Sequence, residues 1–247
     1  MDSGSGGLSV FKEIRKVLPD EKYIYFSDNA HCPYGEKSQE YIVDRCRTIV
    51  DGMIAEGVQA VVIACNTATA AAIATLRSEY DIPFVGMEPA VKPAALGTRS
   101  GVIGVLATAG TLKASKYLLT RSRFEEDVTI VEHVGCGFVE LVESCELEGP
   151  HAEEVCGRSL RPLLDAGADT IVLGCTHYPF LLPVLQKIAG PGIRFIDPAP
   201  AVARQLVKVL EEKEIGLADG EPEIKLYASG SDETLSKLFI HICKKST

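Results

Sequence analysis

Short runs of β-branched and aromatic residues alternate along the chain with segments whose apolar residues recur at helical spacing. The runs are predicted strands, at residues 23–27, 60–64, 83–86, 101–106, 128–132, 170–174, 193–196 and 223–228. Several are apolar at every position, which is typical of strands covered on both faces of a parallel sheet. This alternation predicts an α/β fold with mostly right-handed crossovers.

The segments between the runs have the spacing of amphipathic helices. Within residues 36–57, four apolar side chains fall on one helical face: Ile42, Cys46, Ile49 and Met53. Near the start of the chain another four share a face in the same way: Leu8, Phe11, Ile14 and Leu18. Both segments are therefore predicted helices that pack one apolar face against a sheet.

A coarse duplication divides the chain, because each half carries an apolar strand, a cysteine and then a helical segment. Proline-rich stretches around residues 89–93 and 198–200 are the predicted boundaries. We expect a first α/β domain over residues 1–91 and 201–247 and a second over 92–200. The two would be pseudosymmetric, with mostly parallel sheets flanked by helices, and a small ligand would bind in the cleft between them.

The composition limits the kinds of partner. Of 247 residues, 46% are hydrophobic and 24% are charged, which is ordinary for a soluble globular protein. No apolar run approaches the roughly 18 residues that a membrane span needs. The net charge is −9 and there is no Lys/Arg-rich run. A membrane and nucleic acid are therefore not expected as main partners, whereas an anionic substrate is compatible with an acidic chain.

Features of the N-terminus and the cysteines predict a cytoplasmic protein. The opening residues MDSGSGGL have neither the basic nor the apolar region of a secretory signal. No CxxC pair occurs, and the cysteines lack the tight spacing of a disulfide framework. We expect reduced thiols at all eight positions, which are 32, 46, 65, 136, 145, 156, 175 and 243.

Two cysteines stand at matching junctions. Cys65 and Cys175 each end an apolar run and precede a polar pair, Asn-Thr or Thr-His, and a predicted helix. Ligands of open α/β sheets bind at the carboxyl ends of strands, and a helix N-terminus favours a thiolate. Either cysteine alone reads as a buried structural residue. Together they indicate a disulfide, a metal pair or two proton-transfer groups, and His177 alone is too few additional ligands for a metal.

Other polar residues have both a functional and a structural interpretation. Asn66, Thr67 and Thr176 could bind a carboxylate or phosphate at helix N-termini, or simply cap the helices. The glycine-rich segment 2–8 could hold an anion or form a flexible leader. The segment PYG at 33–35 reads as a turn. His177 could tune Cys175 or be a satisfied core histidine, and Glu143 could be a solvated charge.

Six motifs together resemble the glutamate racemases of the aspartate/glutamate racemase superfamily. They occur in the order of that family and cover essentially the whole chain: DSGSGGL (2–8), CPYG (32–35), ACNTA (64–68), ATAGTLKAS (107–115), FVELVE (138–143) and GCTHYP (174–179). ACNTA together with GCTHYP is the specific part of the resemblance. Relatives that act on aspartate typically have Glu where this chain has His177, which favours the glutamate branch.

The resemblance implies a cofactor-independent isomerase that interconverts L- and D-glutamate and supplies D-glutamate for peptidoglycan, and hence for the cell wall and cell shape. By position, Cys65 would deprotonate D-glutamate with the help of Asp2. Cys175 would deprotonate L-glutamate with the help of His177 and Glu143. The implied substrate-binding residues are Asp2, Ser3, Tyr34, Gly35, Asn66, Thr67, Thr176 and His177. No metal and no cofactor are implied, and a homodimer is one possible state of assembly.

Elementary chemistry agrees with these roles. A racemase binds both enantiomers, so it needs a base on each side of the substrate, which a duplicated strand–cysteine–helix unit supplies. Without pyridoxal phosphate as an electron sink, preorganised donors must stabilise carbanion character. One departure stands out: the family has a short apolar strand before the DSG segment, whereas Asp2 here follows Met1 directly. We therefore expect a poorly anchored Asp2 and an empty central strand position.

Three other functions stay open. An aspartate or hydantoin racemase would share the two-thiol chemistry. Cys175 with His177 could form a cysteine hydrolase pair, although a single nucleophile would leave Cys65 unexplained. The non-enzymatic alternative is a protein that closes on an acidic amino acid without isomerising it.

Overall fold

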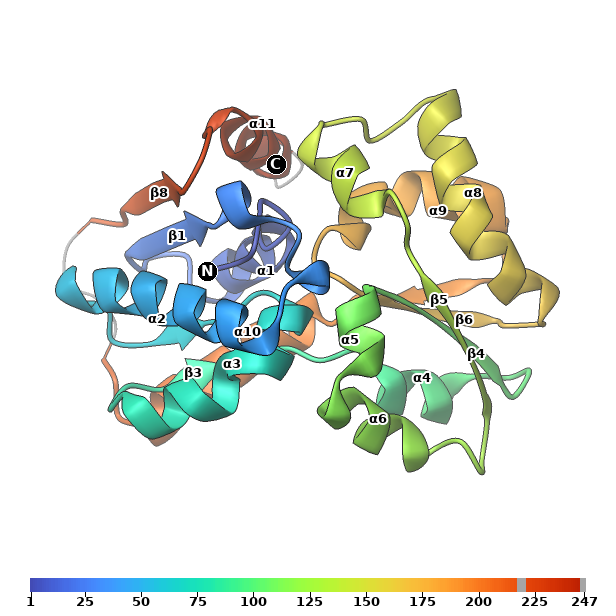
Figure 1. The fold of residues 1–247 in the computed structure, drawn as a ribbon, viewed down its shortest axis with the longest axis horizontal. Coiled ribbons are helices and arrows are strands. Elements are labelled where there is room, and N and C mark those ends of the chain that lie inside the picture. The colour runs from blue at the N-terminus through green and yellow to red at the C-terminus, as the bar shows by residue number, and fades with distance from the viewer. Residues whose placement is uncertain (217–220, 245–247) are drawn as a thin grey trace. The chain divides into compact units, whose positions relative to one another are not determined.

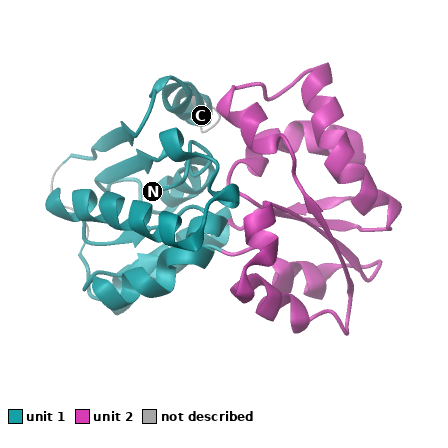
Figure 2. Ribbon diagram, viewed as in Figure 1, with its two compact units in different colours: residues 1–87, 199–247 teal, residues 88–198 magenta. Residues whose placement is uncertain are grey.

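The computed structural model describes residues 1–216 and 221–244, which form alternating helices and parallel strands (Figure 1). This confirms the predicted α/β fold class. The chain divides into two compact units (Figure 2): residues 1–87 with 199–247, called unit 1 below, and residues 88–198, called unit 2. The boundaries predicted from the proline-rich stretches lie close to these limits. Autonomy of each unit as a domain stays a prediction.

Unit 1 contains two pairs of parallel strands. They are β1 (Tyr23–Ser27) with β8 (Ile224–Ala228), and β2 (Val61–Val62) with β3 (Phe84–Val85). The first two residues of the chain lie between the pairs. The Met1 ammonium donates to the Val62 carbonyl at 2.8 Å, and the Ala64 N–H donates to the Met1 carbonyl at 2.8 Å. On the other side the Asp2 N–H donates to the Phe26 carbonyl at 3.0 Å.

The expectation of a poorly anchored Asp2 is therefore wrong. Asp2 is fully buried and bridges to Ser27 as a strand residue would. The central position is occupied by backbone at Met1 and Asp2. A cavity of about 380 Å³ adjoins Met1 and is lined by residues of both strand pairs, including Ile24 and Val61. Backbone hydrogen bonds hold Met1 against the β2 side and Asp2 against the β1 side, so Asp2 is well anchored.

Helices pack against the strands of unit 1 in two clusters. The helices and 3₁₀ turns are α1 (Leu8–Val17), η1 (Asn29–His31), η2 (Tyr34–Glu36), α2 (Gln39–Ala55), α3 (Asn66–Glu79), α10 (Ala199–Glu212) and α11 (Glu233–Lys244). One apolar cluster joins α2 and α3 to Val61 and Ile63, and the other joins α1 and α10 to Val85. All four residues of the predicted α2 face are buried.

Unit 2 contains one parallel sheet with the strand order β5-β4-β6-β7. Its strands are β4 (Val102–Ala107), β5 (Thr129–Val134), β6 (Thr170–Gly174) and β7 (Arg194–Ile196). Its helices are α4 (Val91–Gly97), α5 (Ala109–Lys113), α6 (Ser115–Ser122), α7 (Phe138–Glu143), α8 (Pro150–Asp165) and α9 (Leu182–Ala189), with a 3₁₀ turn η3 (Tyr178–Leu181). Every residue of β6 is buried, as its apolar sequence predicts.

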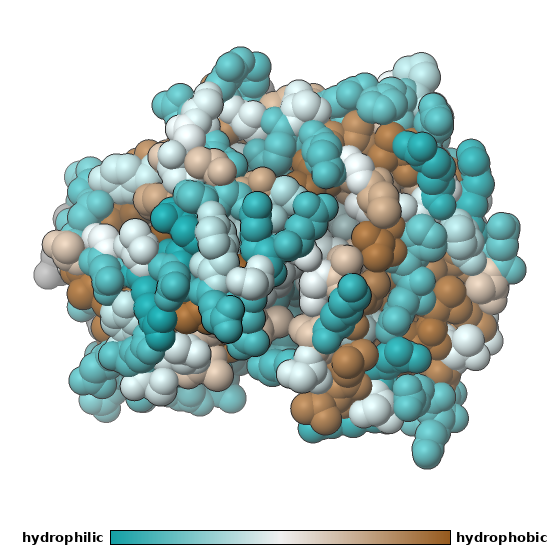
Figure 3. All heavy atoms as spheres, in the orientation of Figure 1, coloured by the Kyte–Doolittle hydropathy of each residue, from teal (hydrophilic) through white to brown (hydrophobic). Residues whose placement is uncertain are grey.

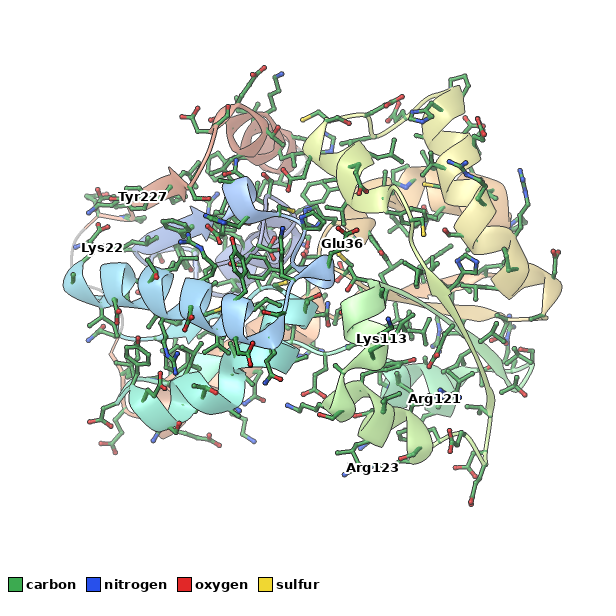
Figure 4. All side chains as sticks on the ribbon, in the orientation of Figure 1. Lys22, Glu36, Lys113, Arg121, Arg123 and Tyr227 are labelled. Carbon is green, nitrogen blue, oxygen red and sulfur yellow. The ribbon has the colours of Figure 1, made fainter. Side chains whose placement is uncertain are left out.

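The surface is mostly hydrophilic on the face shown in Figure 3, with smaller hydrophobic patches. In unit 2 the exposed large apolar side chains include Leu96, Leu118 and Leu119. Arg121, labelled in Figure 4, extends from α6 and pairs with Glu132 of β5 at 3.4 Å. Among the described residues, no helix has the length and apolar composition needed to cross a membrane.

Candidate active site

Cys65 lies where β2 leads into α3, as the sequence predicts. It is the N-cap residue of α3, and its Sγ accepts the Ala68 N–H at 3.3 Å. The thiol lies 3.6 Å from the Ser3 hydroxyl oxygen, to which it can donate. Cys65 is buried and forms no disulfide among the described residues. Its sulfur therefore combines a structural role, capping a helix, with contact to a second predicted site residue.

The glycine-rich segment 2–8 is buried and ordered around the Asp2 carboxylate, so the flexible-leader interpretation is wrong. Asp2 Oδ2 accepts the N–H groups of Gly7 at 2.9 Å and Gly4 at 3.3 Å. A Cβ atom at Gly7 would lie 2.6 Å from the Asp2 Cβ and 2.9 Å from the Tyr25 hydroxyl. Glycine is therefore required at this position for the backbone to approach the carboxylate.

Asn66 stands out in unit 1 as a buried polar side chain. It is 4% exposed, and neither its amide oxygen nor its amide nitrogen has a hydrogen-bond partner among the described residues. Leaving a buried amide unpaired is costly, so such groups usually have a functional explanation. Capping does not provide one, because the Cys65 sulfur is the cap. Thr67 follows in the first turn of the same helix and is also buried.

The predicted turn at 33–35 is found as η2, which begins at Tyr34 and ends at Glu36 (labelled in Figure 4). Gly35 is half-buried, whereas Tyr34 is almost fully buried. The Tyr34 hydroxyl donates to Asp28 Oδ2 at 2.6 Å. The hydrogen of the Tyr34 hydroxyl is therefore engaged by Asp28, whereas its main chain lies in the turn. The sequence interpretation missed Asp28, whose one available signal is a carboxylate directly after a predicted strand.

In unit 2, Cys175, His177 and Glu143 form a chain of polar contacts. The Cys175 sulfur lies 3.7 Å from His177 Nδ1, and His177 Nε2 lies 2.8 Å from Glu143 Oε1. An ionised Glu143 can only accept, so Nε2 carries the hydrogen and Nδ1 is left to accept the thiol proton. The solvated-charge interpretation of Glu143 is wrong, because its carboxylate pairs with a buried histidine. His177 is a core histidine with a partner at each ring nitrogen, as one of its two interpretations predicts, and one of these partners is Cys175.

Packing around Tyr178 holds α7 in place. A left-handed Gly137, with φ of 81°, ends the turn between β5 and α7. The buried Tyr178 ring packs edge-on against Phe138 of α7 with 4.9 Å between centroids. The Tyr178 hydroxyl donates to the Gly135 carbonyl at 3.4 Å. These contacts fix the helix that carries Glu143 beside the segment that carries His177.

The second cysteine junction differs from the first in one respect. Cys175 directly follows β6, as predicted, but no α-helix begins there. The 3₁₀ turn η3 comes first, and α9 begins only at Leu182. The expectation that Thr176 stands at a helix N-terminus is therefore wrong, although Thr176 is buried beside Cys175. Both thiols therefore follow a strand, but only Cys65 caps a helix.

Each unit thus has, just after a strand of a parallel sheet, a buried thiol that contacts a hydrogen-bond acceptor. The carboxyl ends of such strands are where open α/β proteins bind their ligands. The sequence pattern of Asp/Glu/Hydantoin racemases matches residues 5–206, and the chain belongs to that family. It is an isomerase family, so the cysteine hydrolase alternative is not favoured.

Within this family, the chain is similar to proteins named glutamate racemase. The chain is 49% identical over 230 residues to a glutamate racemase of Ectopseudomonas mendocina, covering 93% of this chain and 88% of the relative. It is 51% identical over 221 residues to a glutamate racemase of Pseudomonas aeruginosa, covering 89% and 83%.

Solved structures agree. The glutamate racemase isoform RacE1 from Bacillus anthracis aligns with a TM-score of 0.86 at 32% identity. Escherichia coli glutamate racemase, solved in complex with L-glutamate and the activator UDP-MurNAc-ala, aligns with a TM-score of 0.86 at 37% identity. Each alignment covers 98% of this chain and 92% of the other. The α/β fold is therefore that of glutamate racemases.

Proposed function

We propose that this protein interconverts L- and D-glutamate without a cofactor and that it supplies D-glutamate for peptidoglycan in the cytoplasm. The observation that carries the proposal is that each unit has one buried thiol just after a strand of its parallel sheet. Cys65 contacts the Ser3 hydroxyl in unit 1, and Cys175 contacts His177 in unit 2. The relatives named glutamate racemase support glutamate, rather than aspartate or a hydantoin, as the substrate.

In the proposed reaction, one sulfur removes the α-proton while the other delivers a proton to the opposite face. From L-glutamate, the Cys175 thiolate takes the proton and the Cys65 thiol gives its own. One C–H bond breaks as another forms, so the carbon centre is inverted. The two sulfur atoms end with exchanged protonation states, ready for the reverse reaction from D-glutamate.

The proposed helpers differ between the two thiols. His177 Nδ1 accepts the Cys175 proton, and the Glu143 carboxylate, 2.8 Å from Nε2, stabilises the imidazolium that forms. Asp2 assists on the Cys65 side, with its carboxylate held by the glycine N–H groups described above.

The remaining predicted residues would hold the substrate. Asn66, Thr67 and Thr176 adjoin the thiols in sequence, so they are placed to bind groups attached to the α-carbon. The unpaired amide of Asn66 offers both a donor and an acceptor. Ser3, Tyr34 and Gly35 complete the proposed set together with Asp2 and His177. Fixed donors on the carboxylate would stabilise carbanion character in the transition state.

Solvent isotope incorporation tests this function. The protein is incubated in D₂O separately with L- and D-glutamate, without added cofactor, while NMR follows loss of the α-proton and circular dichroism follows inversion. Deuterium entry with loss of optical activity from either enantiomer is expected. Exchange that requires added pyridoxal phosphate, or binding without any exchange, would contradict the proposal.

Cys65→Ser and Cys175→Ser assign the two faces. Enantiomers have equal free energy, so kcat/KM for isomerisation must fall equally in both directions in any variant. The informative signal is therefore exchange without inversion. We expect Cys175→Ser to retain exchange with D-glutamate only, and Cys65→Ser with L-glutamate only. The opposite pattern would reverse the assignment.

A homodimer stays a prediction. Light scattering coupled to size-exclusion chromatography, with and without glutamate, tests it directly. A mass near 26.5 kDa would contradict the dimer, because that is the mass of one chain.

A further inference from the structure

Asp28 is a buried carboxylate outside the residues assigned so far. It directly follows β1 and has no exposed surface. Arg45 of α2 binds it with both ends of its guanidinium, Nη2 to Oδ1 at 2.7 Å and Nε to Oδ2 at 3.0 Å. The Tyr34 hydroxyl donates to the same Oδ2 at 2.6 Å. Bidentate pairing of this kind fixes geometry as well as charge.

The carboxylate is held in its charged form. Burial alone would raise the pKa of Asp28, but hydrogen bonds from Arg45, Tyr34 and Ser229 outweigh burial and lower it. The Arg45 side chain is 22% exposed, so the pair sits at the edge of the buried interior. A charged Asp28 can only accept, so it engages the hydrogen of the Tyr34 hydroxyl and holds the Tyr34 ring in place.

Asp28 also contacts the other binding segment of unit 1. Its N–H donates to the Asp2 carbonyl at 3.0 Å, directly before Ser3. One residue thus fixes the backbone of the Asp2–Ser3 segment through its main chain. It fixes the Tyr34–Gly35 segment through its side chain. These segments lie far apart in sequence, and both are proposed to hold the substrate.

We propose that Asp28 and Arg45 are positioning residues that set the substrate-binding geometry of unit 1, so that Tyr34 and Gly35 present main-chain groups to glutamate. This inference rests on the proposed glutamate racemase function. Neither residue contacts the reacting atoms. Their loss should weaken binding of the ground state and the transition state alike, which raises KM more than it lowers kcat.

A neighbouring ion pair, with side chains 39% and 37% exposed, provides a surface control on the same helix. Arg47, two residues along α2, binds Glu79 of α3 in the same bidentate way, with Nη2 to Oε1 at 2.6 Å and Nε to Oε2 at 2.9 Å. It joins two elements of the same unit, yet it touches neither binding segment. Arg47→Met therefore reports the cost of losing a structural ion pair on this helix.

The experiment compares Arg45→Met, Arg45→Lys, Tyr34→Phe and Arg47→Met in the full-length chain. Circular dichroism gives KM and kcat with both enantiomers, and calorimetry with racemic glutamate gives an apparent dissociation constant. We expect Arg45→Met to raise KM and the dissociation constant about tenfold or more, with kcat changed about threefold or less. Tyr34→Phe should raise KM less, Arg45→Lys should recover part of the loss, and Arg47→Met should leave KM unchanged.

Removing only Arg45 leaves a buried charge and can prevent folding. If Arg45→Met does not fold, the double variant Asp28→Asn/Arg45→Met, which removes both charges, takes its place. This double variant and the separate variant Tyr34→Phe then test whether the Asp28 contacts set KM. Unchanged KM and binding in folded variants, or an equal rise in KM for Arg47→Met, would overturn the inference. A wild-type protein that binds glutamate without isomerising it would instead refute the proposed function, while calorimetry on the variants would still test positioning.

Discussion

At the scale of single residues, Cys65 carries two functions in one sulfur atom. It caps α3 by accepting the Ala68 N–H, and it is the proposed acid and base of unit 1. Serine keeps a cap acceptor, whereas alanine has none. We expect both Cys65→Ser and Cys65→Ala to abolish racemisation. Only Cys65→Ala should lower the free energy of unfolding, by about 1 kcal/mol, in urea denaturation. Equal stability of the two variants would contradict the capping role.

Glu143 can be tested against a neighbour on the same helix. Glu143→Gln removes the charge that stabilises a protonated His177 but leaves an acceptor for Nε2. Because this acts on proton transfer rather than binding, kcat should fall about tenfold or more with little change in KM. Glu140→Gln is the control, since Glu140 is exposed on α7. Steady-state circular dichroism measures both, and equal effects of the two variants would rule out a specific role for Glu143.

Asp169 provides a pH-dependent contribution to stability. Burial opposes its charge, but hydrogen bonds from Thr98, Arg99, Ser100 and Thr170 lower its pKa from 3.8 to about 2. The unfolded chain therefore binds more protons than the folded chain between these values. The stabilisation is present above about pH 4 and is lost as pH falls toward about 2.

Asp169→Asn should therefore lower the free energy of unfolding by about 1 kcal/mol at neutral pH, a value reduced for solvent screening. Urea denaturation at several pH values measures the difference between variant and wild type. The difference should shrink between about pH 4 and about pH 2. A difference that is constant with pH would show that the charge is not its source.

The sequence predicted site residues where the signal is local. Cys65 and Cys175 follow apolar strands, and His177 stands two positions from Cys175. Glu143 was ambiguous because only folding brings it to His177, across 34 positions. Asp28 and Arg45 were missed for the same reason, since their pairing depends on how α2 packs against β1.

At the scale of elements, strand positions were predicted well because continuous apolar runs are distinctive. The predicted run at 23–27 coincides with β1, and 170–174 coincides with β6. The strand role of Met1 and Asp2 was missed because two residues carry no periodicity.

The α-helix predicted directly after Cys175 does not form there, and a proline explains why. Pro183 has no N–H, so an α-helix beginning at Tyr178 would lack the bond to the Pro179 carbonyl. The chain instead forms η3 and begins α9 at Leu182, where Pro183 falls in the tolerated first turn.

Pairing of β4 with β6 depends on a glycine. A Cβ at Gly174 would lie 2.8 Å from the Ala107 Cβ and 2.9 Å from the Leu106 carbonyl oxygen, neither of which can move aside. Gly174→Ala should lower the free energy of unfolding by about 1–3 kcal/mol. Gly52→Ala is the control of opposite sign, because no atom lies within 4 Å and Gly52 stands in helix α2. It should stabilise by about 0.5–1 kcal/mol. Urea denaturation measures both, and equal signs would contradict the steric argument.

At the scale of the whole molecule, the two units differ in continuity, because unit 1 is made of two separate segments of the chain. Unit 2 is one continuous segment with its own four-stranded sheet. Residues 88–198 expressed alone should therefore unfold cooperatively in urea. Residues 1–87 alone should not fold, because β1 lacks β8 and α1 lacks α10. Circular dichroism and the dispersion of NMR amide signals measure both, and a folded 1–87 fragment would contradict the prediction.

Unit 2 lies in sequence between the two segments of unit 1, so the ribosome makes all of unit 2 before unit 1 is complete. Tyr23 of β1 pairs with Ile224 of β8, which is made about 200 residues later. At roughly 5–20 residues per second, that delay is about 10–40 s. During this delay unit 2 is synthesised completely, while the apolar faces of α1 and β1 stay exposed because α10 and β8 have not yet been made. The nascent N-terminal third of this chain is therefore the part that most needs a chaperone, although it becomes one of the most buried parts of the finished protein.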